Sequence, residues 1–239
     1  PSDGALSFPI LRSDAQMAAR DFEPRDPDTG EALRSEPTPE TKPLHCTSIY
    51  ALNKKDQEQY TLLAATAHGL SAVACRYFNV YGPRQSLSNP YTGVAAIFSS
   101  RIKNGNRPLI YEDGKQSRDF IHVRDIAAAK VFLLENPKAN RQSFNLCTGR
   151  ATSVEDVALV LAKLLGAPHL TPEIPLSYRT GDTRHCFGDP SRLAALGWRA
   201  SISFEDGMKD LVQWSAQQAS VDLVGKAHAE LLARGLVKA

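Results

Sequence analysis

An apolar run that directly follows a helix-favouring segment is the feature that most constrains the fold. Residues 48–68 are rich in Ala, Leu, Gln, Glu and Lys, and Gly69 stands where such a helix would end. The run LSAVACRYFNVYGP, residues 70–83, follows and is too short for a typical helix. Such a run is typical of a parallel strand that is covered on both faces. Helix, short loop and buried strand in this order predict an α/β fold.

The rest of the chain continues this alternation with less regularity. Helix patterns occupy residues 92–104, 124–135, 154–166, 191–197, 207–218 and the tail from 221, and residues 142–149 have a strand pattern. Two short strands joined by a turn at Asp113-Gly114 are predicted within residues 107–123. Ser153 and Ser203 are each followed three positions later by an aspartate, which predicts a capped helix start at both places.

Residues 1–46 are polar and interrupted by prolines. Proline fixes φ and lacks an N–H donor, so such a stretch favours extended or turn backbone over regular elements. We expect a surface loop or an arm. Whether it is a disordered linker or an ordered flap over a site stays open at this point.

Composition excludes several classes of protein. Of the 239 residues 42% are hydrophobic and 23% are charged, which is ordinary for a folded globular chain. The formal net charge of +2 is not concentrated in a basic run, so neither nucleic acid nor an anionic membrane is an expected partner. No apolar stretch reaches the roughly 18 residues that span a bilayer, and the first residues lack the layout of a signal peptide.

The cysteines and histidines predict neither disulfides nor a metal site. The four cysteines lie far apart without a CxxC pair, so we interpret them as reduced thiols of a cytoplasmic protein. The six histidines show no HExxH or paired spacing, and no cysteine-histidine cluster matches a zinc site. We interpret all six as structural or surface residues and predict no metal ligands.

The segment TSIYALNKKDQ, residues 47–57, places Tyr50 and Lys54 one helical turn apart on one face. A free tyrosine has a pKa near 10, so a tyrosine that acts as a base at neutral pH needs positive charge nearby. Lys54 can supply that charge, which makes the pair a candidate for proton transfer. Because such pairs also arise by chance, the alternative is that Tyr50 packs at the helix start and Lys54 is solvated.

Four sequence blocks, in this order and spacing, resemble a known family. They are Tyr50xxxLys54, RYFNVYGP (76–83), DGKQSRDFIHVRDIA (113–127) and YRTGDTRHCFGDPSRL (178–193). Over about residues 40–215 the chain is similar to the extended short-chain dehydrogenase/reductases that modify nucleotide sugars. The segments around the first two blocks look most like the group that epimerises dTDP-L-rhamnose at C4. UDP-glucose 4-epimerases and sugar-nucleotide 4,6-dehydratases are its neighbours.

The resemblance implies NAD as cofactor and a nucleotide sugar as substrate. Tyr50 would take the proton from a sugar hydroxyl while hydride leaves the same carbon for NAD, and Lys54 would hold the nicotinamide ribose. Tyr77 and Asn79 are further implied cofactor contacts. Asn79 is also a substrate candidate, because it follows the predicted strand at the edge where open α/β sheets bind ligands.

Arg118 and Arg179 are candidate clamps for the diphosphate, because a guanidinium presents paired donors to phosphate oxygens and keeps its charge. A surface salt bridge is the alternative for each of them. The resemblance implies that Asp182 orients the nucleotide ribose or a neighbouring arginine. Asn89 and Asn145 are further substrate-binding candidates, for which a turn or strand-end role is the alternative.

The glycines depart from the pattern of a dinucleotide site. Such a site uses a glycine-rich turn at a helix N-terminus, so that the backbone can approach the pyrophosphate. None of the 15 glycines lies closer to another than Gly181 does to Gly188, which excludes GxGxxG and the Walker loop. By resemblance the chain corresponds to the C-terminal portion of an enzyme, preceded by some four strands, or about 100 residues at about 30 per βαβ unit.

We therefore expect the C-terminal part of a Rossmann-type parallel sheet, followed by a smaller mixed α/β substrate domain. Residues 1–46 would be an arm and 47–82 a remnant of the dinucleotide-binding domain, to which the chain returns at about 118–147. Residues 83–239 would mainly bind the nucleotide sugar. Without the preceding strands, the apolar faces of residues 71–80 and of the Tyr50 helix would be exposed, which predicts poor solubility unless another chain covers them.

The resemblance leaves three hypotheses for function. The first is NAD-dependent 4-epimerisation of a nucleotide-diphospho sugar through a 4-keto intermediate, with a dTDP-6-deoxyhexose as the expected substrate. The second is a sugar-nucleotide 4,6-dehydratase. The third is a non-catalytic fragment that binds sugar nucleotide through Arg118 and Arg179. A homodimer is common in this enzyme class.

Overall fold

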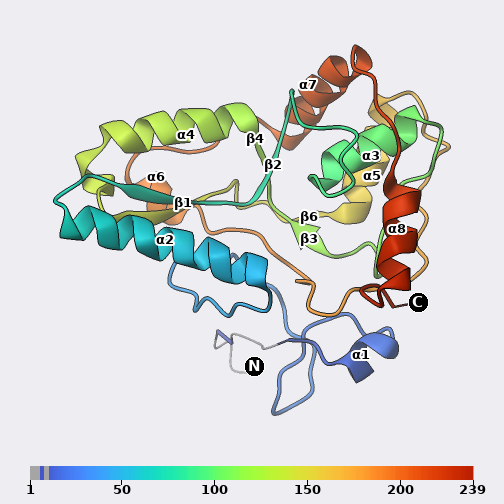
Figure 1. Ribbon diagram of the computed structural model, residues 1–239, viewed down its shortest axis with the longest axis horizontal. Coiled ribbons are helices and arrows are strands. Elements are labelled where there is room, and N and C mark those ends of the chain that lie inside the picture. The colour runs from blue at the N-terminus through green and yellow to red at the C-terminus, as the bar shows by residue number, and fades with distance from the viewer. Residues whose placement is uncertain (1–5, 8–10, 239) are drawn as a thin grey trace.

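The computed structural model describes residues 6, 7 and 11–238 and shows an α/β protein (Figure 1). The helices are α1 (Asp14–Ala18), α2 (Ile49–Ala67), α3 (Val94–Lys103), α4 (Val123–Glu135), the 3-10 helix η1 (Pro137–Ala139), α5 (Val154–Leu164), α6 (Ser191–Ala195), α7 (Phe204–Ala216) and α8 (Val224–Ala233). The strands are β1 (Val73–Tyr77), β2 (Asn79–Tyr81), β3 (Ser117–Arg118), β4 (Phe120–His122), β5 (Gln142–Leu146) and β6 (Thr152–Ser153).

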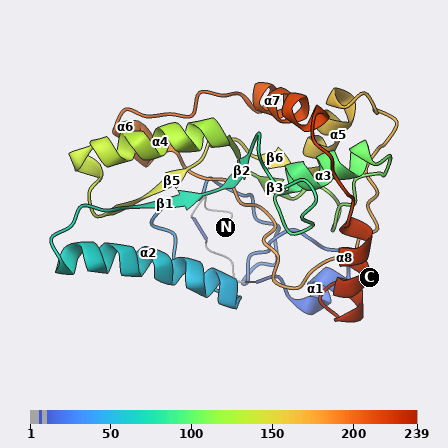
Figure 2. The same cartoon turned by 45° about the horizontal axis from the view of Figure 1, so that its top comes forward.

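One part of the molecule is a three-layer arrangement. Strands β1 and β5 pair in parallel, with Val73 opposite Gln142 and Tyr77 opposite Leu146. Helix α4 lies on one side of this pair and α2 on the other (Figure 2). The core on the α4 side contains Ile121, Ile126, Ala129, Leu133, Phe144, Leu146 and Leu193. Burial of this apolar surface holds α4 and α6 against the strands.

The apolar run at residues 70–83 forms two strands rather than the single strand predicted. Strand β1 pairs with β5, whereas β2 pairs in parallel with β4. The change of partner occurs at Phe78: its N–H donates to the carbonyl of Leu146 at 3.4 Å, and the N–H of Asn79 donates to that of Asp119 at 2.8 Å. Within β1 only Ala74 is buried, so the strand is also less covered than predicted.

The second core lies between α3, α5 and α7, next to β2 and β4 (Figure 1). Its buried side chains include Tyr81, Phe98, Ile102, Phe120, Val157, Leu161, Met208 and Leu211. Both predicted caps are confirmed, since the hydroxyl oxygen of Ser153 accepts from the Asp156 N–H at 3.0 Å and that of Ser203 from the Asp206 N–H at 3.1 Å. These caps satisfy free N–H groups at the starts of α5 and α7.

The predicted pairing of two strands across Asp113-Gly114 is wrong. The turn exists, and Gly114 has φ +81°, but the segments on its two sides pair elsewhere. Leu109 forms a bridge with Glu173, and β3 pairs antiparallel with β6. Partners distant in the sequence therefore satisfy the backbone groups that a hairpin would have used.

Helix α2 presents a large apolar surface to solvent. Within α2, whose residues are all described, only Ala65 is buried. The exposed apolar side chains of this helix are Ile49, Tyr50, Leu52, Tyr60 and Leu63. An ion pair holds α2 to β1, because Arg76 donates to Glu58 at 2.7 and 2.8 Å. The expected exposure of this helix is confirmed for the chain on its own.

The N-terminal stretch is an ordered arm over the described residues 11–46. It contains α1 within the range expected to be loop, a bridge between Arg25 and Ala32, and a bridge between Thr38 and Gly188. The arm runs below the strands in Figure 1 and reaches the loop that follows residue 176. These contacts favour an ordered arm over a disordered linker, whereas its role as a flap over a site stays a prediction. No helix in the described part of the chain is both long and apolar enough to cross a membrane.

Candidate substrate pocket

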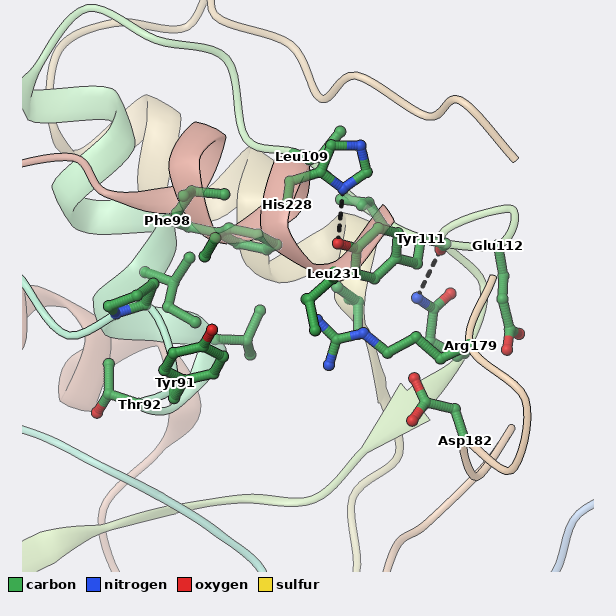
Figure 3. Close-up of a pocket in the computed structure, with 18 of the residues that line it drawn as sticks. Tyr91, Thr92, Phe98, Leu109, Tyr111, Glu112, Arg179, Asp182, His228 and Leu231 are labelled. Atoms are coloured by element: carbon green, nitrogen blue, oxygen red, sulfur yellow. Dashed lines mark hydrogen bonds between the residues drawn. The ribbon is translucent and has the colours of Figure 1, made fainter. Parts of the chain in front are cut away.

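A cavity of about 330 Å³ lies between α3, α8, the segment before β3 and the loop that carries Arg179 and Asp182 (Figure 3). Its apolar wall includes Val94, Ile97, Phe98, Leu109, Val224 and Leu231. Its polar side includes Asn79, Glu112, Gln116, Arg118, Arg179 and Asp182. The volume falls within the range of small-molecule sites, and the division into apolar and polar sides suits a ligand with both characters.

The pocket brings together predicted residues that are far apart in the sequence. Asn79 stands at the start of β2, Arg118 at the end of β3, and Arg179 and Asp182 in the loop before α6. Strand β2 pairs with β4, strand β3 pairs with β6, and a bridge joins Arg118 to Cys186. The tertiary structure thus brings four of the six candidates for substrate binding to one cavity, whereas Asn89 and Asn145 do not line it.

Arg118 anchors the loop that carries the other charged residues. Its guanidinium donates to the carbonyl oxygens of Ser117 at 2.8 Å, Arg184 at 2.9 Å and Thr183 at 2.7 Å. Burial lowers the pKa of Arg118. The surface salt bridge considered as the alternative is not formed, since no carboxylate pairs with Arg118 among the described residues. Arg118 therefore shapes the pocket wall as well as lining it.

Arg179 lies against an aromatic side chain that the sequence did not single out. Its guanidinium carbon is 4.8 Å from the centre of the Tyr111 ring, and its buried Nε has no hydrogen-bond partner within the described structure. The Tyr111 hydroxyl is 2.8 Å from Nδ1 of His228 on α8 (Figure 3). His228 therefore lines the pocket, whereas the sequence indicated only a structural or surface residue. The amphipathic pattern of the tail predicted the helix that carries His228, but not the surface that this helix contacts.

The two acidic residues of the pocket face arginines. Asp182 is exposed at the surface, partial desolvation raises the pKa of its carboxyl, and the positive charges of Arg179 and Arg118 oppose that rise. Glu112 is only 3% exposed, and Arg12 and Arg184 both donate to its carboxylate. The carboxylates are thus charge-compensated, as buried charges need to be.

Asp119 is a further site-forming residue that sequence reasoning missed. It is fully buried, and its carboxylate accepts from the N–H groups of Thr148 and Gly149, each at 2.8 Å. Its backbone accepts from Asn79 at 2.8 Å and donates to Cys186 at 3.1 Å. Asp119 thereby fixes both chain segments next to Arg118. The only signal in the sequence was its position between two residues of the RDFIHV block.

Comparison with known proteins identifies the family. The model of the NAD dependent epimerase/dehydratase family matches residues 26–147. The chain belongs to this family. A dTDP-L-rhamnose 4-epimerase from Burkholderia thailandensis is 36% identical over 220 residues, which are 91% of this chain and 58% of that relative. The expected family resemblance is confirmed.

Solved structures of the family confirm the α/β fold. The UDP-glucose 4-epimerase of Thermotoga maritima with UDP-glucose matches with a TM-score of 0.70 and 34% identity, over 79% of this chain and 60% of that one. The UDP-glucose 4-epimerase of Thermus thermophilus in complex with NAD matches with a TM-score of 0.66 and 29% identity, over the same shares. The chain therefore spans about three-fifths of the length of these epimerases.

The expected catalytic pair of the epimerase/dehydratase family lies outside the pocket. Tyr50 is 72% exposed at the start of α2, and the Lys54 ammonium is 5.7 Å from the centre of its ring. Lys54 donates to Gln57 at 3.2 Å, and Tyr77 is half exposed at the end of β1. Figures 1 and 2 show the N-terminal end of α2 at the same end of the layer as the carboxyl end of β1. The two residues share one face, but neither contacts the cavity.

Asn89 and Asn145 use their side chains for backbone contacts. The Asn89 oxygen accepts from the N–H of Tyr91 at 2.9 Å, which stabilises a turn next to the pocket. Asn145 is buried, and its amide donates to the carbonyl of Thr38 at 2.9 Å. In this structure Asn89 serves a turn, and Asn145 joins β5 to the arm.

The described residues do not form a complete NAD site. Tyr50, Lys54 and Tyr77, three of the residues predicted to contact the cofactor, are exposed at the surface. The 239 residues contain no glycine-rich turn to receive the pyrophosphate. Among residues 6, 7 and 11–238, no group of three or more His, Cys, Asp and Glu side chains could hold a metal ion.

Proposed function

We propose that this protein is an NAD-dependent nucleotide-sugar 4-epimerase that works through a 4-keto intermediate on a dTDP-6-deoxyhexose. The observation that carries the proposal is the convergence of Asn79, Arg118, Arg179 and Asp182 on one cavity with an apolar wall. Similarity to a dTDP-L-rhamnose 4-epimerase supports the choice of nucleotide and sugar. Similarity to UDP-glucose 4-epimerases supports the reaction class.

The pocket has the chemistry of a site for a nucleoside diphosphate. The apolar wall formed by α3 and α8 suits the base and ribose, and the arginines suit the diphosphate. The buried Nε of Arg179 has no hydrogen-bond partner among the described residues, so its guanidinium keeps donor capacity for a phosphate oxygen. Arg118 is already bonded to three carbonyls and would act mainly through its charge. Asp182, opposite both arginines, would orient them or the ribose.

We assign proton transfer to Tyr50, with Lys54 as the positive charge that stabilises the phenolate. Bound NAD would supply the hydride acceptor and donor at C4, and the chemistry needs no net oxidant because the hydride returns to the sugar. With the nucleotide in the pocket, the sugar would extend past Asn79 towards the start of α2. The residues of this chain would bind and orient the nucleotide sugar and exchange the proton of its hydroxyl group.

A second candidate is a binding module without redox chemistry. Two observations favour it for the 239 residues alone: Tyr50 lies outside the pocket, and the sequence has no glycine-rich turn. A 4,6-dehydratase is the remaining alternative of the same family. Calorimetry with NAD and with dTDP distinguishes the binding module from the enzyme, because the binding module would bind dTDP but not NAD.

The test of the epimerase is direct. The protein expressed from its complete gene should convert dTDP-L-rhamnose to its C4 epimer, followed by NMR of the sugar. Tyr50→Phe should abolish turnover and leave dTDP affinity unchanged, because Tyr50 does not line the pocket. Tyr60→Phe is the matched control, since Tyr60 is equally exposed at 72% on the same helix. Absence of turnover with every dTDP- and UDP-hexose would reject the proposal.

We also propose that the protein works in the cytoplasm as a homodimer. All four cysteines are free, which suits a reducing compartment. The exposed apolar side chains of α2 supply surface that a second subunit could cover. Analytical ultracentrifugation decides the assembly: a dimer supports the proposal and a monomer at micromolar concentration contradicts it.

A further inference from the structure

The N-terminal arm contributes a buried arginine behind the pocket. The Arg12 guanidinium donates to the two carboxylate oxygens of Glu112 at 2.8 and 2.9 Å, and to the carbonyl of Asp182 at 2.6 Å. The paired side chains of Arg12 and Glu112 are only 6% and 4% exposed. It also donates to the carbonyl of Phe22 within the arm at 2.9 Å. Glu112 and Asp182 line the cavity, although Arg12 itself does not.

Arg12 sets the charge that the pocket presents to an anion. Glu112 faces the same cavity as Arg118 and Arg179, so its carboxylate would repel a diphosphate if it were not compensated. Arg184 also donates to Glu112, but it pairs with two other carboxylates, Glu23 and Asp113, as well. Arg12 and Arg184 are thus the two guanidiniums that donate to Glu112. Loss of Arg12 would leave Glu112 with Arg184 alone, which it shares with Glu23 and Asp113.

Arg12 also belongs to a set of contacts that hold the loop at residues 178–189. Besides the Arg12 bond to Asp182, Asp14 accepts from the Thr180 hydroxyl at 3.0 Å. At the far end of the loop the N–H of Thr38 donates to the carbonyl of Phe187 at 2.8 Å. The arm thus forms hydrogen bonds with both ends of the segment that carries Arg179 and Asp182.

We propose that Arg12 is a positioning residue of the nucleotide-sugar site. It neutralises Glu112 and fixes the loop of Arg179 and Asp182 without contacting the ligand. The inference rests on the proposed function and assigns the arm a part in diphosphate binding. It follows that the arm and the pocket are energetically coupled.

The experiment compares Arg12→Ala with Arg12→Lys and with the matched control Arg34→Ala. Arg34 lies on the same arm and pairs with Glu36, but its side chain is 92% exposed. By calorimetry, Arg12→Ala should weaken dTDP binding about tenfold, as expected for loss of a charge-assisted contact, and Arg12→Lys should lie between it and the wild type. Hydrogen exchange should accelerate in residues 178–187 for Arg12→Ala only.

A double variant separates charge from scaffolding. If Arg12 acts by neutralising Glu112, adding Glu112→Gln to Arg12→Ala should recover most of the lost affinity, because the repelling charge is gone. Wild-type affinity and wild-type exchange in Arg12→Ala would overturn the inference. If the wild-type protein binds neither dTDP nor UDP, the proposed function fails. Hydrogen exchange then still tests Arg12: faster exchange of residues 178–187 in Arg12→Ala supports its positioning role, and unchanged exchange contradicts it.

Discussion

The guanidinium of Arg179 is stacked over the ring of Tyr111, and the hydroxyl of Tyr111 bonds in turn to His228. This arrangement links the loop before α6, the turn before β3 and the C-terminal helix α8 around one cavity. A stacked guanidinium is held in place yet keeps its in-plane donors. The Arg179 side chain is thereby preorganised for an anion.

Replacement of Arg179 should weaken nucleotide binding. Arg179→Ala should lower dTDP affinity about tenfold or more, because a hydrogen bond to a charged group contributes about 1.5–3 kcal/mol. Arg179→Lys should recover part of the loss, since lysine keeps the charge without the planar stack. Calorimetry measures both. Arg192→Ala is the control, because Arg192 also lies over an aromatic ring, that of Phe144, but outside the pocket. Equal effects at the two arginines would contradict the assignment.

The hydroxyl of Tyr111 should stabilise the docking of α8. Tyr111→Phe removes the hydrogen bond to His228 and should cost about 0.5–1.5 kcal/mol in urea unfolding. Trypsin cleavage after Lys226, within α8, should become faster because the helix opens more often. Tyr60→Phe, on the exposed face of α2, should change neither measurement. Unaltered cleavage in Tyr111→Phe would show that α8 is held by its apolar contacts alone.

The ion pair between Glu58 and Arg76 should make the attachment of α2 depend on pH. The hydrogen bond from Arg76 holds the pKa of Glu58 below its ordinary value of 4.5. Because the pKa is lower in the folded state, the stabilisation is complete above about pH 4.5 and is lost as the pH falls through the lowered pKa. Glu58→Gln should therefore destabilise the protein at pH 7 by about 1 kcal/mol, and less at pH 3. Glu36→Gln, in an exposed pair, is the control for urea unfolding at both pH values. If the difference in unfolding free energy between the wild type and Glu58→Gln grows as the pH falls, the prediction is wrong.

Two helical glycines should respond in opposite ways to alanine. A Cβ at Gly207 in α7 would collide with the hydroxyl of Tyr81, which is buried against Phe204. Gly207→Ala should cost about 1–3 kcal/mol through overpacking. A Cβ at Gly225 in α8 would meet nothing within 4 Å, so Gly225→Ala should be neutral or stabilise by up to about 1 kcal/mol. Thermal unfolding of both variants provides the comparison, and a neutral Gly207→Ala would show that α7 can shift away from Tyr81.

Local signals in the sequence were sufficient for the longer helices, but not for α1, which lies in the segment expected to be loop. Ser153 and Ser203 identified the starts of α5 and α7, and Gly69 marked the end of α2 with φ +66°. These signals act over a few residues, because a cap satisfies N–H groups within one turn of itself. Arg118 and Arg179, which the sequence predicted as diphosphate clamps, both line the pocket, and their role as clamps stays a prediction.

The tertiary structure alone decided which segments meet. It divided residues 70–83 between two partner strands, replaced the predicted hairpin by the pairing of β3 with β6, and brought Tyr111 to His228 and Arg12 to Glu112. The sequence determined where most of the longer helices lie and which residue types bear the charge. Contacts between distant segments depend on how apolar faces pack and how buried charges are paired, and these are properties of the folded chain that no short window of sequence contains.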